Sequence, residues 1–163
     1  MYKRQVYGLR MLGMFLILPI FAIYASGLSG NPTQLQIGLA LGIYGLTQAV
    51  FQIPFGMSSD FFGRKKVIYF GLALFVLGSI IAGSSSQIEN IIIGRAIQGA
   101  GAISAVLTAL LSDLTRDEHR TKAMAIVGGS IGLTFALSLV ISPWLNDKIG
   151  VSGIFFLMAL LSI

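Results

Sequence analysis

Residues 35–66 read LQIGLALGIYGLTQAVFQIPFGMSSDFFGRKK. Residues 35–57 contain no Asp, Glu, Lys or Arg, whereas the stretch closes on three consecutive basic side chains, Arg64, Lys65 and Lys66. A helix over residues 35–57 is about 35 Å long, which is enough to cross the roughly 30 Å hydrocarbon core of a bilayer. The stretch therefore predicts a transmembrane helix that is followed by a polar, basic loop at residues 58–66.

The same alternation of apolar run and polar turn continues on both sides of this stretch. We predict spans at residues 6–27, 35–57, 67–83, 88–111, 122–145 and 151–163, with Gly, Ser, Asn or Pro at turns between them. The last run is only about 20 Å long, which is too short to cross a bilayer. We therefore expect the sixth helix to be incomplete and the coding sequence to be truncated.

The composition is typical of a helical membrane protein. Hydrophobic residues make up 55% of the chain and charged residues 10%, against roughly 25% charged residues in a soluble domain. There is no Cys, and the single His, His119, lies in a charged stretch, so we expect no disulfide, no metal site and no cofactor. The spans contain no Ser/His/Asp arrangement and no paired carboxylates, so we do not expect an enzyme.

Lys and Arg are distributed unevenly between the two sides of the predicted bundle. The loops after the second and fourth spans hold Arg64, Lys65, Lys66, Arg116, Arg120 and Lys122, and the opposite side carries Lys148. Because positive loops stay in the cytoplasm, we expect a cytoplasmic amino terminus. We attribute the formal charge of +5 to this topology and expect no nucleic-acid partner.

Residues 1–5, MYKRQ, have the sequence of a translated transposon-end adaptor of the kind used in sequencing libraries. We interpret them as an artefact and exclude them from the fold. The transmembrane bundle is therefore assigned to residues 6–163.

Two arginines lie within predicted spans. Arg95 is about seven residues, or roughly 10 Å, inside the fourth span, and Arg10 lies in the inner third of the first. A guanidinium at this depth requires protein, water or a partner around it, and is by default a candidate for function. Two roles remain open for each arginine, a place in a substrate or proton path and a structural hydrogen-bond hub. The second role is favoured for Arg10, whose side chain can reach the interface.

Two polar stripes follow helical spacing. Tyr44, Gln48 and Gln52 recur every four residues on the second span, so they share one face. They either line a polar cavity or make hydrogen bonds between helices. A second stripe, made of Ser104, Thr108 and Ser112 on the fourth span, is more simply explained by hydroxyls that bond to their own helix backbone.

The loop at residues 56–66, GMSSDFFGRKK, carries a family resemblance. It resembles the signature loop of the major facilitator superfamily, G-x-L-A-D-R-x-G-R-K. The matching residues are Gly56, Asp60, Gly63, Arg64 and Lys65, while Ser58 and Phe61 replace the usual Leu and Arg. The resemblance implies a conformational latch between two six-helix halves. Asp113, at the inner end of the fourth span, is expected to join Arg64 or Lys65 in this latch.

Two further motifs are similar to those of the same family. Residues 92–101, IIGRAIQGAG, resemble its fourth-helix motif, so Arg95 and Gln98 are implied to lie on a proton or substrate path. The fifth-helix motif of antiporters is partly present, because Gly129 and Pro143 fit it. Ser138 and Ser142, however, stand where glycines are expected. This departure leaves the direction of transport open.

The resemblance extends over residues 6–163 and implies an all-α fold, the amino-terminal six-helix half of a twelve-helix transporter. It implies proton-coupled efflux of small amphipathic compounds across a bacterial inner membrane. The partners would be a small-molecule substrate, protons, membrane lipid and the missing carboxy-terminal half. An importer or facilitator on the same fold is one alternative, and a non-transporting scaffold or decayed fragment is another. Because no Asp or Glu lies deep within the first five spans, the proton carrier would be Asp113, an arginine-linked water path or a carboxylate elsewhere.

Overall fold

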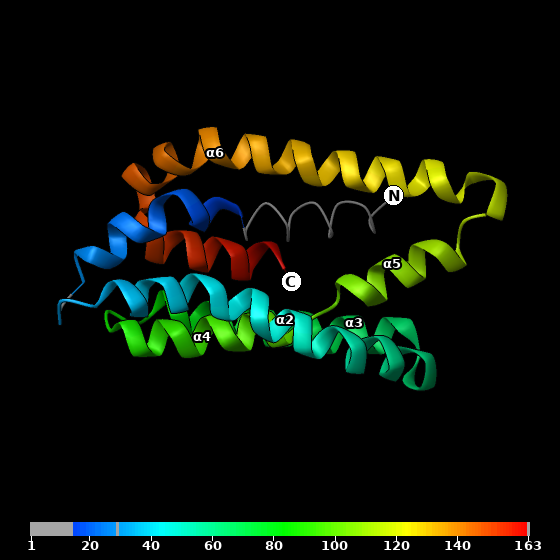
Figure 1. The fold of residues 1–163 in the computed structure, drawn as a ribbon, viewed down its shortest axis with the longest axis horizontal. Coiled ribbons are helices and arrows are strands. Elements are labelled where there is room, and N and C mark those ends of the chain that lie inside the picture. Colours follow the sequence, from blue (N-terminus) through cyan, green and yellow to red (C-terminus); the bar gives the residue numbers. More distant parts are fainter. Residues whose placement is uncertain (1–14, 29, 163) are drawn as a thin grey trace.

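A computed structural model describes residues 15–28 and 30–162 of the chain, and the regular structure in this part is helical. A first helical segment covers Phe15–Ser26. It is followed by α2 (Gln34–Phe62), α3 (Arg64–Gly83), α4 (Ile88–Ala100), α5 (Ser104–Asp113) and α6 (Asp117–Leu161) (Figure 1). The all-α architecture, which the apolar runs predict and the family resemblance implies, is therefore confirmed.

The helix α2 begins at a capping box and ends at a single glycine. The hydroxyl of Thr33 accepts a hydrogen bond from the backbone N–H of Gln36 (3.3 Å), and the Gln36 side chain accepts one from the backbone N–H of Thr33 (2.8 Å). At the other end Gly63 has φ 89°, a backbone conformation that glycine adopts without strain.

The predicted loop at residues 58–66 is wrong, because helix continues on both sides of Gly63. The predicted span 35–57 stops five residues before the end of α2, and α3 starts at Arg64 instead of residue 67. The physical reason is that a membrane boundary is not a helix boundary. Residues 58–62 include no helix breaker, so α2 continues beyond its uncharged stretch.

The predicted fourth span, residues 88–111, is divided into α4 and α5 by three buried residues, Gly101, Ala102 and Ile103. Gly101 lies directly against the backbone carbonyl of Gly71 on α3, where a Cβ atom would collide with it. Ile103 is fully buried beside the same glycine. The break therefore lies where the chain packs closely on α3, and hydropathy alone does not predict it. Figure 1 shows α5 rising from this break toward the start of α6.

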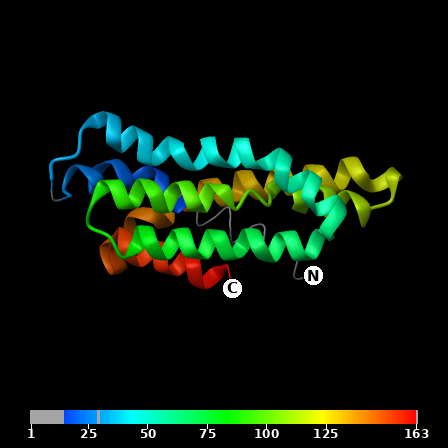
Figure 2. The same ribbon diagram turned by 90° about the horizontal axis from the view of Figure 1, so that it is seen from below.

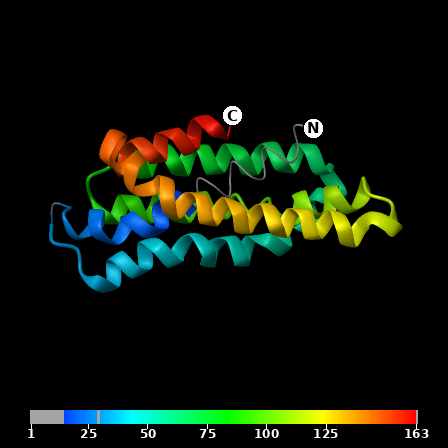
Figure 3. The same ribbon diagram turned by 90° about the horizontal axis from the view of Figure 1, so that it is seen from above.

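The predicted spans at 122–145 and 151–163 are joined in α6, which is helical on both sides of one residue, Gly150. The prediction of a loop is therefore wrong for residues 146–149, which are helical, whereas Gly150 does form the turn. Gly150 has φ 66° and ψ 174°, and the chain reverses direction there, so that its last stretch runs back beside the rest of α6 (Figures 1 and 3). A positive φ is available to glycine, which explains why one residue suffices for the turn.

The helices form a bundle with α4 between α2 and α3 (Figure 2). The main apolar core joins the first helical segment, α3, α4 and the last stretch of α6 through buried side chains such as Phe21, Phe75, Ile91 and Phe155. A smaller cluster around Phe55, Val67 and Ile103 connects α2, α3 and the α4–α5 break.

Large apolar side chains also cover the outside of the bundle, among them Leu35, Ile53, Tyr69 and Val140. Within the described part of the chain, four helical stretches are long and apolar enough to cross a membrane: α2, α3, residues 88–113 and α6. An apolar exterior on helices of this length is the arrangement expected for a protein surrounded by lipid. The prediction of a multi-pass helical membrane protein therefore agrees with the structure.

Candidate functional site

Arg64 connects three helices at one end of the bundle. Its Nε atom donates to Oδ2 of Asp113, the last residue of α5, at 3.0 Å, and its Nη1 atom lies 2.7 Å from Oδ1 of Asp60 on α2. Arg64 itself is the first residue of α3. We call Ser59, Asp60, Arg64 and Asp113 the Arg64 cluster. The structure thus brings Asp113 to Arg64, one of the two basic partners that the sequence suggested.

The ion pairs of the Arg64 cluster are partly exposed. The side chains of Asp60 and Asp113 are 60% and 53% exposed, and that of Arg64 is 23% exposed. Ion pairs in such surroundings contribute about 0–1 kcal/mol each, because water competes for both charges. The cluster can therefore be closed or opened by small changes in free energy.

Ser59 is a member of this cluster that sequence reasoning missed. The residue is 1% exposed, and its hydroxyl accepts a hydrogen bond from Nη1 of Arg64 at 2.5 Å and donates one to the Gly56 carbonyl at 2.6 Å. The sequence contains a signal for it, because the signature loop of the family has Ala at this position and this chain has Ser.

The remaining signature-loop residues have separate roles in the geometry. Gly63 supplies the turn with its positive φ, and Gly56 supplies the carbonyl that Ser59 contacts. Lys65 is exposed at the start of α3, and Phe61 is 84% exposed on the last turn of α2. The arginine that the family pattern places at position 61 thus has no counterpart in the Arg64 cluster.

A second arginine, Arg95 on α4, is buried, with 1% of its surface exposed. Its guanidinium carbon lies 4.8 Å from the ring centroid of Tyr44, a cation–π contact. Its Nε atom donates to the Ala40 carbonyl at 3.4 Å, and Nη1 donates to Oε1 of Gln98 at 3.2 Å. We call Tyr44, Ser79, Arg95 and Gln98 the Arg95 cluster.

Hydrogen bonds extend from Gln98 to a third helix. Its Nε2 atom donates to the Ser79 hydroxyl on α3 at 2.6 Å, and that hydroxyl donates to the Phe75 carbonyl at 2.7 Å. Within residues 15–28 and 30–162, none of the ion pairs involves Arg95. Its charge is stabilised instead by a carbonyl, an amide oxygen and an aromatic face. Gln98, predicted on a path with Arg95, is therefore its direct partner.

Glycines allow the helices around the Arg95 cluster to approach closely. A Cβ atom on Gly78 of α3 would lie 2.5 Å from the backbone nitrogen of Gln98 and 2.5 Å from the Gly94 carbonyl. Gly99 of α4 faces the Tyr44 carbonyl of α2 in the same way. Glycine at these crossings permits backbone-to-backbone contact, which brings the side chains of three helices to one point.

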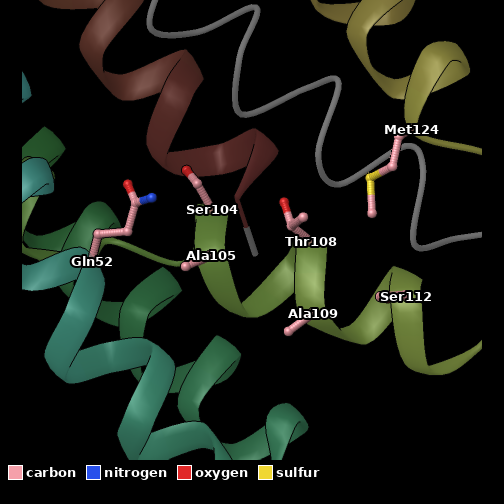
Figure 4. A pocket seen from close by; sticks show the side chains of 7 residues that line it. All are labelled: Gln52, Ser104, Ala105, Thr108, Ala109, Ser112 and Met124. Carbon is pink, nitrogen blue, oxygen red and sulfur yellow. The ribbon is translucent and has the colours of Figure 1, made fainter. Parts of the chain in front are cut away.

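A cavity of about 600 Å³ opens between α2, α5 and α6. It is lined by Gln52, Ser104, Ala105, Thr108, Ala109, Ser112 and Met124 (Figure 4). The polar stripe of α5 therefore faces a cavity, although self-bonding to the helix was the favoured interpretation. Beside it, Nε2 of Gln48 donates to the Ser104 hydroxyl at 3.1 Å.

The predicted stripe on α2 divides between two environments. Tyr44 belongs to the Arg95 cluster, Gln48 bonds to α5 and Gln52 lines the cavity. Both interpretations of the stripe, a polar cavity and bonding between helices, thus apply to different members. The division follows from the α4–α5 break, beyond which α5 replaces α4 as the neighbour of α2.

The fifth-helix residues belong to neither cluster. Gly129 and Pro143 are exposed on α6, whereas Ser138 and Ser142 are buried. The Ser142 hydroxyl donates to the Leu16 carbonyl of the first helical segment, and that of Ser138 donates to the Thr134 carbonyl at 2.8 Å. At both positions a serine hydroxyl makes a hydrogen bond that the glycine of the motif could not make. Arg10 and residues 1–5 lie outside the described residues.

Comparison with known proteins gives consistent matches along the chain. The sequence profile of the Major Facilitator Superfamily matches residues 6–163. The chain is 55% identical over 157 residues to the inner membrane transport protein YajR of Escherichia coli (strain K12), which covers 96% of this chain and 34% of YajR. It is 52% identical over 158 residues to an uncharacterized transporter of Buchnera aphidicola subsp. Schizaphis graminum, covering 97% and 40%.

A more distant relative is the tetracycline resistance protein, class H, of Pasteurella multocida, which is 31% identical over 141 residues. That match covers 85% of this chain and 34% of the relative. The chain therefore spans 34–40% of the length of these three relatives.

Proposed function

The chain belongs to the major facilitator superfamily, and on that premise we propose that it forms part of a secondary transporter that exports small amphipathic compounds in exchange for protons. The fold is all-α and corresponds to the amino-terminal half of the family architecture. Because the chain spans 34–40% of the length of its relatives, we assign the activity to the complete protein that contains it.

The observation that carries the proposal is the Arg64 cluster. It connects the ends of α2, α3 and α5 through two partly exposed ion pairs. A transporter that alternates between two conformations needs contacts that hold one of them and are readily broken. Asp60, Arg64 and Asp113 meet this requirement, because each pair is worth about 0–1 kcal/mol in water and more when water is excluded. Gly63 and Lys65 complete this proposed latch.

The cavity between α2, α5 and α6 supports a substrate path. Its volume of about 600 Å³ lies within the range of small-molecule sites. Gln52, Ser104 and Thr108 provide hydrogen-bonding groups, while Ala105 and Met124 provide apolar surface. A lining of this mixed character suits amphipathic compounds. Asp113 is one residue beyond Ser112 of the lining, so it is our candidate among the described residues for coupling protons to substrate.

The Arg95 cluster supports the path from the other side of the α4–α5 break. Arg95 keeps a buried positive charge close to α2 through its contact with Tyr44. A fixed cation of this kind repels protons and cations from its surroundings and attracts anionic groups. We infer that Arg95 and Gln98 set the electrostatic potential of the path rather than carry the proton themselves.

The placement in the membrane follows from the charges. The positive-inside rule orients the ends of α2 and α5, with Arg64, Lys65 and Arg116, toward the cytoplasm. We propose a bacterial inner membrane, as for the relative named inner membrane transport protein YajR. Export is favoured because another relative is named a tetracycline resistance protein. The partners are then lipid, protons, the substrate and the remainder of the same protein.

The test uses the complete open reading frame that contains this sequence, expressed in everted bacterial membrane vesicles. Tetracycline and a fluorescent amphipathic dye serve as probes. We expect uptake into the lumen when the lumen is made acidic, and loss of that uptake when nigericin collapses the gradient. Accumulation driven by the opposite gradient would instead show import, and movement independent of pH would show a facilitator. The site assignments are wrong if Asp60→Asn and Arg95→Ala both transport normally at equal expression.

A further inference from the structure

We propose that Ser59 is a positioning residue that holds the Arg64 guanidinium in the orientation needed to bridge Asp60 and Asp113. Its contacts are established by the geometry alone, while its consequence for transport rests on the proposed function of the Arg64 cluster. The inference is independent of the substrate and of the direction of transport.

The direction of both hydrogen bonds at Ser59 is determined by their partners. A guanidinium can only donate and a carbonyl can only accept. The Ser59 hydroxyl must therefore donate its proton to the Gly56 carbonyl (2.6 Å) and present a lone pair to Nη1 of Arg64 (2.5 Å). Because Ser59 is 1% exposed, water does not compete for these positions. Ser59 is thus a preoriented acceptor on α2.

Ser59 is the hydrogen-bond acceptor of an Arg64 nitrogen that also forms an ion pair with Asp60. Nη1 of Arg64 lies 2.7 Å from Oδ1 of Asp60 in an ion pair, and it donates a hydrogen bond to Ser59 at 2.5 Å. A hydrogen bond depends on direction more than an ion pair does, so the bond to Ser59 sets the orientation of the planar guanidinium. Nε then points at Oδ2 of Asp113 at 3.0 Å. Without Ser59, the guanidinium keeps only the Asp60 ion pair and the bond to Asp113, so its plane is less constrained.

The departure from the family pattern gives this contact added importance. The pattern has Ala where this chain has Ser59, and Arg where it has Phe61. Phe61 is 84% exposed and adds no charge to the cluster. The cluster therefore depends on one guanidinium to bridge two carboxylates, and the added hydroxyl provides directional control of that group.

The experiment is a double-mutant cycle in thermal stability on the complete protein in lipid nanodiscs. The variants are Ser59→Ala, Asp113→Asn and the double substitution. Ser58→Ala is the matched control, since its hydroxyl makes no hydrogen bond to Arg64 in the part of the chain that the structure describes. We expect Ser59→Ala to lower the melting temperature by about 2–4 °C, and to lower it by less than half as much when Asp113→Asn is already present.

The cycle separates positioning from a local helix bond. Ser59 and Asp113 are joined through Arg64, so dependence of one effect on the other requires that link. Equal shifts in both backgrounds would overturn the proposal, because the hydroxyl would then act only through the Gly56 carbonyl. If Ser59→Ala accumulates too poorly to melt, Ser59→Cys keeps the volume and weakens the acceptor. It is expected to give the same pattern with smaller shifts.

The transport assay distinguishes this inference from the proposed function. We expect Ser59→Ala to lower the maximal rate of gradient-driven uptake about threefold to tenfold, with little change in the half-saturating probe concentration. Ser59→Thr, which keeps the hydroxyl, should recover most of the rate. Thermal coupling with normal transport would support the positioning role and overturn the latch function of the cluster. Reduced transport without thermal coupling would overturn the positioning role.

Discussion

Arg64 and Arg95 carry the same guanidinium group, but their surroundings differ. Arg64 lies at the end of the bundle, where two partly exposed carboxylates and one buried hydroxyl hold it. Arg95 lies inside the bundle, where a carbonyl, an amide and an aromatic ring hold it without a carboxylate among its described contacts. Arg64 joins the ends of three helices, whereas Arg95 joins α4 to α2 directly and to α3 through Gln98.

Under the proposed transport function, the difference indicates which contacts break during the conformational change and which persist. An exposed ion pair gains little on formation and loses little on breaking, so it suits a contact that opens and closes. A buried guanidinium leaves several groups unsatisfied when it is removed, so it suits a contact that persists. We therefore expect the contacts around Arg95 to hold α2, α3 and α4 together, and the contact of α5 with α2 and α3 at Arg64 to be the weaker of the two.

The largest effect is expected for Arg95→Ala. The change leaves the Ala40 carbonyl and the Gln98 side chain without their donor and opens a cavity between α2 and α4. We expect the free energy of unfolding of the complete protein to fall by about 2–5 kcal/mol. Thermal melting in nanodiscs, together with size-exclusion chromatography of a fluorescent fusion, measures this loss.

Arg95→Lys is the control for that substitution. It keeps the charge but lacks the planar fork that reaches Gln98 and stacks on Tyr44, so an intermediate melting temperature is expected. If Arg95→Ala melted at the wild-type temperature, Arg95 would not organise the centre of the bundle. The proposed difference between Arg95 and Arg64 in their contribution to stability would then be wrong.

A somewhat smaller effect is expected for Gly78→Ala. The new Cβ would lie 2.5 Å from backbone atoms of Gln98 and Gly94, so α3 and α4 must separate to admit it. We expect a loss of about 1–3 kcal/mol in the free energy of unfolding, and uptake to fall with it. Gly42→Ala is the matched control, because nothing lies within 4 Å of the position of its added Cβ. Equal melting temperatures for the two variants would mean that α3 and α4 can move apart at Gly78 without loss of stability.

The smallest change in stability is expected for Asp113→Asn. Removing this partly exposed charge should lower the free energy of unfolding by about 1 kcal/mol or less, while uptake falls about tenfold because α5 is no longer held to Arg64. The stability difference should shrink between low salt and 1 M salt, where screening extends to about 3 Å. Melting curves and uptake rates on the same preparations measure both quantities.

Asp117→Asn is the matched control for loss of the ion pair between Arg64 and Asp113. Asp117 also forms an ion pair, with Arg120 at 2.7 Å, but both residues lie on one turn of α6 and are exposed. We expect no change in uptake for this variant. Equal losses of uptake in Asp113→Asn and Asp117→Asn would show that charge at this end of the protein matters and that the bridge between helices does not.

Much of the candidate site was open to prediction because its residues carry strong local signals. Asp60, Gly63 and Arg64 follow a charge-free run in a recognisable pattern, and Arg95 is a charge inside an apolar helix. The pairing of Arg64 with Asp113 was expected and is present in the structure. The Ser59 contact was not predicted, because a serine in a helix carries no charge and its partner is known only once Arg64 is placed.

The helix boundaries show the limits of the same reasoning. Hydropathy marks where the chain can meet lipid, so it separated residues 35–57 from the polar residues that follow. It does not report whether the backbone remains helical beyond that point, as it does to Phe62. The break at Gly101 is invisible to hydropathy, because all three residues of the break are apolar or small and buried.

The sequence by itself determined that the chain is a set of apolar helices for a membrane, with its basic residues gathered on one side, and it indicated the family. These properties depend on composition and on local patterns, which act through the solvent around each segment. Only the tertiary structure decided which neutral groups surround Arg95, where α4 ends, and which stripe residue lines the cavity. Those outcomes depend on close approach between segments far apart in the sequence, which glycines such as Gly78 and Gly101 permit and which no local pattern specifies.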